Sequence, residues 1–261
     1  MKKNNPIGIF DSGIGGLTIA RAIKRKLPNE SLIYFGDTQH LPYGDKSSKS
    51  IVFFSEQIIN FLKTKKCKAI IVACNSASSY LPISGDCQYI FNVIDPVIKY
   101  LKKFKKLKIG IIGTKATISS KVYFNKIKSL NRELSVEQMS TPLLVPMIEE
   151  GFINEIISKT IIKNYLTRKQ FEKIDKLILA CTHYPLIEKQ IAEVCPEIEI
   201  INTVDIISEF IKDSLESMDL LSLNSFPKYD FYASNYTNSF EKTASLFFKE
   251  EIKLKEIKIW S

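Results

Sequence analysis

Histidine is scarce in the sequence and the C-x-x-C motif is missing. Together these absences exclude several classes of metal and redox site. Only His40 and His183 occur among 261 residues, and none of the five cysteines belongs to a C-x-x-C motif. Structural zinc sites need four ligands, mostly Cys and His, so we expect no metal. An odd number of cysteines without a secretory signal indicates free thiols rather than a disulfide framework.

Long hydrophobic runs are also missing. No apolar stretch approaches the roughly 20 residues that cross a bilayer. The first ten residues carry two lysines but no apolar segment typical of a signal peptide. The hydrophobic content of 45% is nevertheless typical of a globular protein with a substantial core. We therefore expect a cytoplasmic protein that does not enter a membrane.

Arginine is rare although the net charge is +9. Nearly all of the positive charge comes from lysine. The lysines are spread along the chain and lack the interleaved aromatic residues that stack nucleic-acid bases. We therefore predict solvated helix faces and no nucleic-acid partner. A basic binding protein without enzymatic activity remains the alternative, and salt-dependent retention on DNA would distinguish it.

The glycine-rich segment near the N-terminus does not match a nucleotide-binding motif. Gly13, Gly15 and Gly16 do not fit G-x-G-x-x-G, and the chain contains no G-K-[ST]. We predict instead that these glycines let backbone amides approach a carboxylate group.

Apolar strands alternate with amphipathic helices along the chain, which is typical of an α/β fold with parallel sheets. The predicted strands are 7–11, 31–36, 70–74, 89–95, 107–113, 134–139, 176–181, 197–202, 229–234 and 256–260. The predicted helices are 17–27, 48–65, a short one ended by Pro82, one opened at Asp95, 119–130, 152–165, one from Pro185, 206–215 and 237–249. Segments 38–47 and 141–151 contain prolines and are predicted to be loops.

The alternation restarts after about 100 residues, which indicates an internal repeat of domain size. The matched positions are separated by 102 residues for Gly8 and Gly110, 107 for Cys74 and Cys181, and 110 for Asp95 and Asp205. We predict two pseudo-symmetric α/β domains with the active site in the cleft between them. Residues 1–97 plus 207–261 would form the first domain and residues 98–206 the second.

Two cysteines occupy matched settings in this repeat. Cys74 ends the apolar run I-I-V-A-C and precedes N-S-A-S, and Cys181 ends K-L-I-L-A-C and precedes T-H-Y-P. The carboxyl ends of parallel strands are where α/β sheets bind ligands. A thiolate on one face of a carbon atom and a thiol on the other suit proton exchange with inversion. We predict that these two cysteines are the catalytic pair.

The other three cysteines, Cys67, Cys87 and Cys195, lack this setting. We predict that they are small buried apolar residues, as most free cysteines are.

A catalytic thiol needs a neighbour that helps it to ionise. For Cys181 the candidate is His183, two residues further on. For Cys74 both Asp11 and Asp37 are candidates, and Asp11 is favoured because it ends the first strand. The alternative role for either aspartate is to cap the turn that follows it. His40 lies in a polar segment and is predicted to be on the surface.

Five motifs together carry a resemblance to a known family. They are D-S-G-I-G-G-L-T at 11–18, D-T at 37–38 with P-Y-G at 42–44, A-C-N-S at 73–76, I-G-T at 112–114 with A-T at 116–117, and C-T-H-Y-P at 181–185. The chain resembles, over essentially its whole length, the glutamate racemases of the cofactor-independent aspartate/glutamate racemase superfamily.

The resemblance implies that the chain interconverts L- and D-glutamate without cofactor or metal, supplies D-glutamate for peptidoglycan, and forms a homodimer. It implies that Cys74 and Cys181 are the acid/base pair, assisted by Asp11 and His183. The substrate-binding residues that it implies are Asp11, Ser12, Pro42, Tyr43, Gly44, Asn75, Ser76, Thr114, Thr117, Glu149, Thr182 and His183. Racemisation of aspartate, or hydrolysis of an amino-acid derivative on the same fold, remains the enzymatic alternative.

Overall fold

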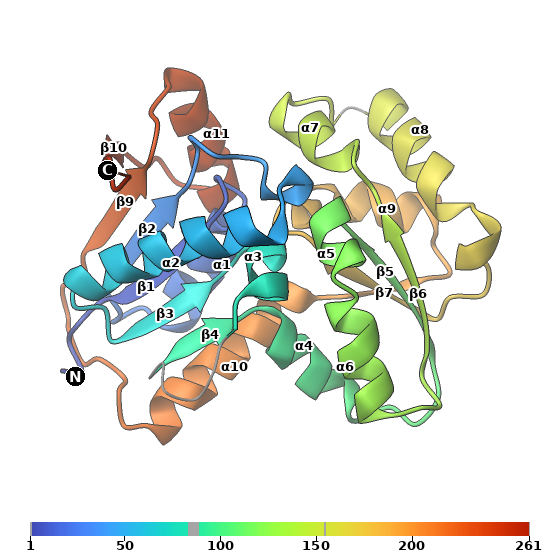
Figure 1. Cartoon of the computed structure of the whole chain (residues 1–261), viewed down its shortest axis with the longest axis horizontal. Helices are drawn as coiled ribbons and strands as arrows, with labels where there is room; N and C mark the ends of the chain where they lie inside the picture. Colours follow the sequence, from blue (N-terminus) through green and yellow to red (C-terminus); the bar gives the residue numbers. More distant parts are fainter. Residues whose placement is uncertain (1, 83–88, 154, 261) are drawn as a thin grey trace.

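The computed structural model describes residues 2–82, 89–153 and 155–260, and its strands form two parallel sheets that lie side by side (Figure 1). The six-stranded sheet has the order β10-β9-β2-β1-β3-β4 and the four-stranded sheet the order β6-β5-β7-β8. The strands are β1 (Ile7–Asp11), β2 (Leu32–Gly36), β3 (Ala69–Val72), β4 (Ile90–Asn92), β5 (Lys108–Gly113), β6 (Ser135–Ser140), β7 (Lys176–Ala180), β8 (Glu199–Ile201), β9 (Tyr229–Ala233) and β10 (Leu254–Glu256).

Helices connect successive strands, as parallel pairing requires. They are α1 (Leu17–Lys26), α2 (Ser48–Thr64), α3 (Asn75–Tyr80), α4 (Ile94–Leu101), α5 (Lys115–Ser119), α6 (Val122–Leu130), α7 (Leu144–Glu149), α8 (Glu155–Leu166), α9 (Glu188–Val194), α10 (Thr203–Ser217) and α11 (Asn238–Phe248), with short 3₁₀ turns η1 (Tyr43–Asp45), η2 (Lys169–Phe171) and η3 (Tyr184–Ile187). Among the described residues, no helix is long and apolar enough to span a membrane.

The internal repeat is visible in the strand order. Strands β2-β1-β3-β4 of the first sheet and β6-β5-β7-β8 of the second follow the same sequence of neighbours, and every described strand pair is parallel. The predicted fold class is therefore confirmed. We propose that each sheet is the core of one domain, with the division at residues 1–97 plus 207–261 and residues 98–206.

Helices cover both faces of the first sheet, which explains why its central strands are apolar throughout. Strands β1, β2 and β3 are buried at every position. Phe10 and Phe35 pack under α2 against Ile51, Ile58 and Leu62, all fully buried. Full burial of such a side chain stabilises the fold by about 1.5–3 kcal/mol. The strand ends are therefore held on a rigid core.

The chain passes between the two sheets along α4 and returns along α10, and these two helices pack against each other (Figure 1). Strands β9 and β10 then extend the first sheet beyond β2. The carboxyl ends of β3 and β7, each followed by one of the two predicted catalytic cysteines, face the region between the two halves.

The prediction of a loop at 141–151 was wrong, because this segment contains helix α7. The prolines had suggested a loop. Pro146 occupies the third position of α7, where a backbone N–H has no partner within the helix. Proline is therefore compatible with this short helix.

Three other local predictions need correction. The helix expected at 119–130 begins only at Val122, as α6, and a separate helix α5 precedes it, with Lys121 at a positive φ of 54° between them. The last strand ends at Glu256, and the following tail packs Trp260 against the core beneath α2. His40, predicted to be on the surface, is half-buried: its ring stacks on Phe54 with centroids 4.1 Å apart.

Candidate active site

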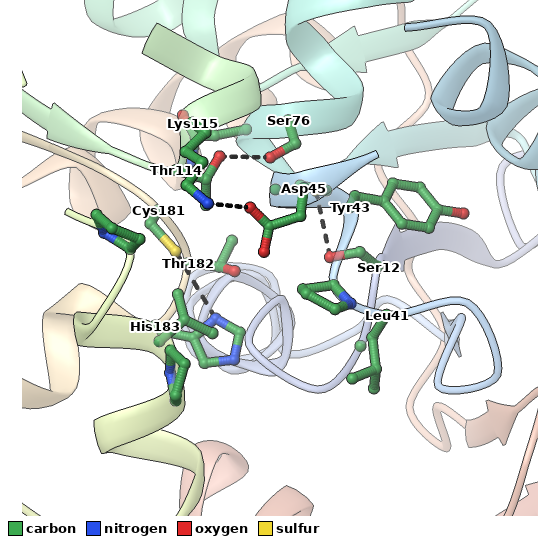
Figure 2. A pocket seen from close by; sticks show the side chains of 18 of the residues that line it. Ser12, Leu41, Tyr43, Asp45, Ser76, Thr114, Lys115, Cys181, Thr182 and His183 are labelled. Atoms are coloured by element: carbon green, nitrogen blue, oxygen red, sulfur yellow. Dashed lines mark hydrogen bonds and ion pairs between the residues drawn. The ribbon is translucent and has the colours of Figure 1, made fainter. Parts of the chain in front are cut away.

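A cavity of about 220 Å³ lies between the two halves, at the carboxyl ends of their strands. Figure 2 shows Cys181, Thr182 and His183 on one side of it and Ser12, Leu41 and Tyr43 on the other. Of the residues predicted to form the site, the following line this cavity: Ser12, Pro42, Tyr43, Gly44, Cys74, Asn75, Ser76, Thr114, Glu149, Cys181, Thr182 and His183. The structure thus brings together nearly all of the predicted site.

Two predicted residues lie behind the cavity wall instead. Asp11 is fully buried, and its Oδ2 accepts a hydrogen bond from the backbone N–H of Gly16 at 3.0 Å. Thr117 is 1% exposed, and its hydroxyl contacts those of Thr114 and Ser76 at 3.1 and 3.4 Å. Both support residues of the wall, and direct substrate contact by them stays a prediction.

Cys74 lies two residues after the end of β3 and caps the N-terminus of α3. Its Sγ lies 3.5 Å from the Ser12 hydroxyl, to which it donates, and 3.5 Å from the backbone N–H of Ala77, from which it accepts. Burial, and then the charge of Asp11, raise the pKa of Cys74 to about 12. The neutral thiol is therefore the form that predominates at pH 7.

The two candidate carboxylates have different neighbours. The charge of Asp11 raises the pKa of Cys74. Burial raises the pKa of Asp11 itself, and the positive charge of His183 partly offsets this rise. Asp37 instead accepts hydrogen bonds from Tyr43 at 2.7 Å and Ser234 at 2.8 Å. The geometry favours Asp11 as the neighbour of Cys74. Because a carboxylate raises the pKa of a nearby thiol, Asp11 would assist by accepting its proton rather than by stabilising the thiolate.

His183 joins the second cysteine to an acidic group. Its Nδ1 lies 3.8 Å from the Sγ of Cys181, and its Nε2 lies 2.9 Å from Oε1 of Glu149. Burial alone would lower the pKa of His183, but the hydrogen bonds to Cys181 and Glu149 outweigh it and raise this pKa to about 10. The imidazole is therefore positively charged at neutral pH, and it stabilises negative charge on the adjacent sulfur.

Direct contacts across the cavity hold the two halves in register. The hydroxyls of Ser76 and Thr114 are 2.8 Å apart, and the Tyr123 hydroxyl donates to Oδ1 of Asn75 at 2.8 Å. Because the amide oxygen of Asn75 is occupied, its NH₂ group is the part that can donate to a ligand.

The approach of the halves is close enough to require glycine at one position of the first loop. A Cβ atom at Gly15 would lie 2.5 Å from both His183 Nδ1 and Thr182 Oγ1. Gly15 thus allows the loop after β1 to pack directly on the segment that follows Cys181.

Sequence reasoning missed an ion pair at the cavity. Asp45 and Lys115 both line it, and Lys115 Nζ lies 3.0 Å from Asp45 Oδ1 (Figure 2). Asp45 directly follows the P-Y-G motif, and Lys115 lies between I-G-T at 112–114 and A-T at 116–117. Their positions next to these motifs were the available signal, but no sequence pattern pairs them.

Two of the remaining cysteines lie away from the cavity. Cys67 is half-buried and Cys195 is buried, and neither lines this cavity, while Cys87 lies outside the described residues. Within the described part of the chain, no group of three or more His, Cys, Asp or Glu side chains is arranged to hold a metal ion.

Comparison with known proteins gives one consistent result. Residues 17–211 match the model of the Asp/Glu/hydantoin racemase family. Glutamate racemase 3 of Caldanaerobacter subterraneus subsp. tengcongensis is 36% identical over 250 residues, covering 95% of this chain and 92% of that protein.

Solved structures agree with the sequence comparison. The crystal structure of glutamate racemase from Francisella tularensis subsp. tularensis SCHU S4 in complex with D-glutamate superposes with a TM-score of 0.93 at 35% identity, covering 98% of each chain. The structure of the isoform RacE1 from Bacillus anthracis gives 0.92 at 33% identity, again covering 98% of each chain. The similarity therefore extends through both halves.

Proposed function

The chain belongs to the Asp/Glu/hydantoin racemase family, and on that premise we propose that it is a glutamate racemase that uses Cys74 and Cys181 as its two acid/base groups. The observation that carries the proposal is that both cysteines line one cavity, although they come from the strand ends of different sheets. The D-glutamate formed would serve peptidoglycan synthesis.

The two sulfurs have different surroundings, as a two-base reaction needs. Cys74 is a thiol at neutral pH, whereas Cys181 faces the charged imidazole of His183. In one direction, a thiolate at Cys181 removes the α-proton of one enantiomer, and the thiol of Cys74 donates a proton to the opposite face. In the reverse direction the Cys74 thiol first gives its proton to Asp11, the resulting thiolate removes the α-proton, and the thiol of Cys181 donates a proton to the other face. In each direction the substrate loses one proton and gains one, and the configuration at the α-carbon is inverted. The two sulfurs end with their charges exchanged, and proton exchange with solvent restores them after the product leaves.

The substrate carries two carboxylates, and the cavity offers hydrogen-bond donors to them. The hydroxyls of Ser76, Thr114 and Thr182 and the NH₂ group of Asn75 supply donors to carboxylates. The Ser12 hydroxyl lies beside the Cys74 thiol, where the α-carbon would be held. Burial of both sulfurs keeps water from the transferred proton.

The test is a racemisation assay without added cofactor. When L-glutamate is incubated with the purified protein, its circular dichroism signal should decay and D-glutamate should accumulate. When D-glutamate is the starting substrate, L-glutamate should accumulate. L-Aspartate is the matched substrate, one methylene shorter, and should turn over much more slowly. Absence of turnover with either glutamate enantiomer would overturn the proposal, and faster turnover of aspartate would reassign the substrate.

We also propose a homodimer in the cytoplasm as the working form. The resemblance to glutamate racemases supports the dimer, and the need for reduced thiols at both catalytic positions supports a reducing compartment. Light scattering should give twice the mass of one chain, and cell fractionation should place the activity in the soluble cytoplasmic fraction.

A further inference from the structure

The ion pair between Asp45 and Lys115 connects the two halves directly at the cavity. Asp45 ends the turn η1, which belongs to the half with the six-stranded sheet. Lys115 begins α5, which directly follows β5 of the other half. Figure 2 shows the carboxylate and the ammonium group pointing toward each other between Cys181 and Tyr43. The pair therefore spans the region through which the two halves face each other.

The catalytic sulfurs are almost inaccessible in this arrangement. Cys74 is 4% exposed and Cys181 is 7% exposed, yet a substrate has to reach both. The halves must therefore separate locally to admit glutamate and to release it. Contacts that cross the cavity decide how often that separation happens.

Asp45 and Lys115 differ in exposure from the hydroxyl contacts that also cross the cavity. The side chain of each is 58% exposed, whereas Ser76 and Thr117, which also contribute to contacts across the cavity, are nearly fully buried. An exposed ion pair is weak, sensitive to salt and quick to break, because water screens both charges. Such a pair can bias an equilibrium between open and closed arrangements without blocking either of them.

We propose that Asp45 and Lys115 form an electrostatic latch that favours the closed cavity, and that both are positioning residues for the racemase reaction. The proposal rests on the proposed function. Closure brings Cys181 and its partner His183 to the same ligand as Cys74. Loss of either charge would lower the population of the closed form and so weaken the apparent affinity for glutamate.

The experiment compares four proteins: wild type, Asp45→Asn, Lys115→Gln, and the charge-swapped Asp45→Lys/Lys115→Asp. At low ionic strength each single variant should raise KM for L-glutamate about two- to fivefold, the range expected for an exposed ion pair. The charge-swapped protein should return to within about twofold of wild type. At 1 M salt, where the Debye length is about 3 Å, the differences should disappear.

A matched control removes a similar ion pair within one half. Lys255 pairs with Asp230 at 2.5 Å, and both lie in the six-stranded sheet away from the cavity. Lys255→Gln changes the net charge as Lys115→Gln does and should leave KM unchanged.

A second readout needs no turnover. Alkylation of Cys74 and Cys181 by iodoacetamide, followed by peptide mapping, should be about two- to fivefold faster in each single variant and close to the wild-type rate in the charge-swapped protein. This measurement separates failure of the latch from failure of the racemase assignment, because it reports only whether the cavity opens.

The latch is overturned if either single variant keeps the wild-type KM and alkylation rates, or if the charge swap fails to restore them. It is also overturned if the effects persist at 1 M salt. If Lys115→Gln raises KM while Asp45→Asn lowers it, Lys115 acts on the substrate directly and Asp45 only repels it. That outcome would replace the latch by a binding role.

Discussion

Nε2 of His183 lies 2.9 Å from Oε1 of Glu149, while the other nitrogen of the ring faces Cys181. This arrangement raises the pKa of His183 to about 10. Removing the carboxylate in Glu149→Gln takes away one of the two groups that raise it, so the pKa of His183 should fall. Titration of the imidazole nitrogens by NMR would measure the pKa of His183 in the wild type and in Glu149→Gln.

The chain suits this measurement because it has only one other histidine, His40, and His40→Asn leaves a single ring to follow. The sign for stability follows from the same shift. A histidine with a pKa near 6.5 when unfolded and about 10 when folded stabilises the fold fully below pH 6.5 and loses that contribution as pH rises through about 10. An unchanged pKa in Glu149→Gln would mean that the carboxylate does not hold the charged imidazole.

The two cysteines should be individually indispensable. Cys74→Ser and Cys181→Ser each remove one acid/base group, and such groups contribute on the order of 10²–10⁴-fold to rate. Each variant should lose at least about a hundredfold in kcat for both enantiomers, because every turnover uses both faces. Cys67→Ala is the matched control outside the cavity and should keep its rate. A variant with more than a tenth of the wild-type kcat would contradict the two-base assignment.

The local pattern of the sequence was sufficient to predict the architecture and the two strands that lead to Cys74 and Cys181. Runs of buried apolar residues ending at Cys74 and Cys181 predict their position because parallel strands end at a common edge. The matched offsets predict two similar halves, and the strand orders agree with them. What local pattern could not predict is which neighbour faces each sulfur.

Two of the errors share a physical cause, which is contact between distant segments. His40 looked polar and exposed, but it packs between Phe54 and Trp260, 220 residues further along the chain. The pairing of Asp45 with Lys115 likewise joins two halves of the repeat. Hydrophobic periodicity shows which face of a segment is apolar, but it does not show which distant residues pack against that face.

The choice between Asp11 and Asp37 can be tested through the reactivity of Cys74. The charge of Asp11 raises the pKa of Cys74, so Asp11→Asn should lower it. In a Cys181→Ser background, alkylation of Cys74 at pH 8 should therefore be faster in Asp11→Asn. Asp37→Asn is the matched control and should leave this rate unchanged. A faster rate in Asp37→Asn alone would assign the tuning role to Asp37.

Gly15 should be sensitive to a single methyl group. A Cβ there would lie 2.5 Å from Nδ1 of His183, so the ring must move. Displacement of a catalytic group by about 1 Å can cost on the order of 10²-fold in rate. Gly15→Ala should thus lower kcat by about ten- to a hundredfold in a folded protein. Gly13→Ala, whose Cβ would have its nearest neighbour 3.8 Å away at Leu41, should lose far less. Equal losses in the two variants would contradict the steric explanation.

The buried ion pair between Lys68 and Glu30 should be a major determinant of stability. Their charged atoms are 2.5 Å apart, and Lys68 also donates to the backbone carbonyls of Lys3 and Leu220. Lys68→Met leaves the Glu30 carboxylate buried without its partner, which should cost about 3–5 kcal/mol in urea-induced unfolding. Lys68→Met/Glu30→Gln should recover part of this loss, because the stranded charge is gone. The exposed ion pair between Lys255 and Asp230 gives the control. Lys255→Gln should lower the free energy of unfolding by less than about 1 kcal/mol. Similar losses in Lys68→Met and Lys255→Gln would mean that burial does not strengthen the dependence on this pair.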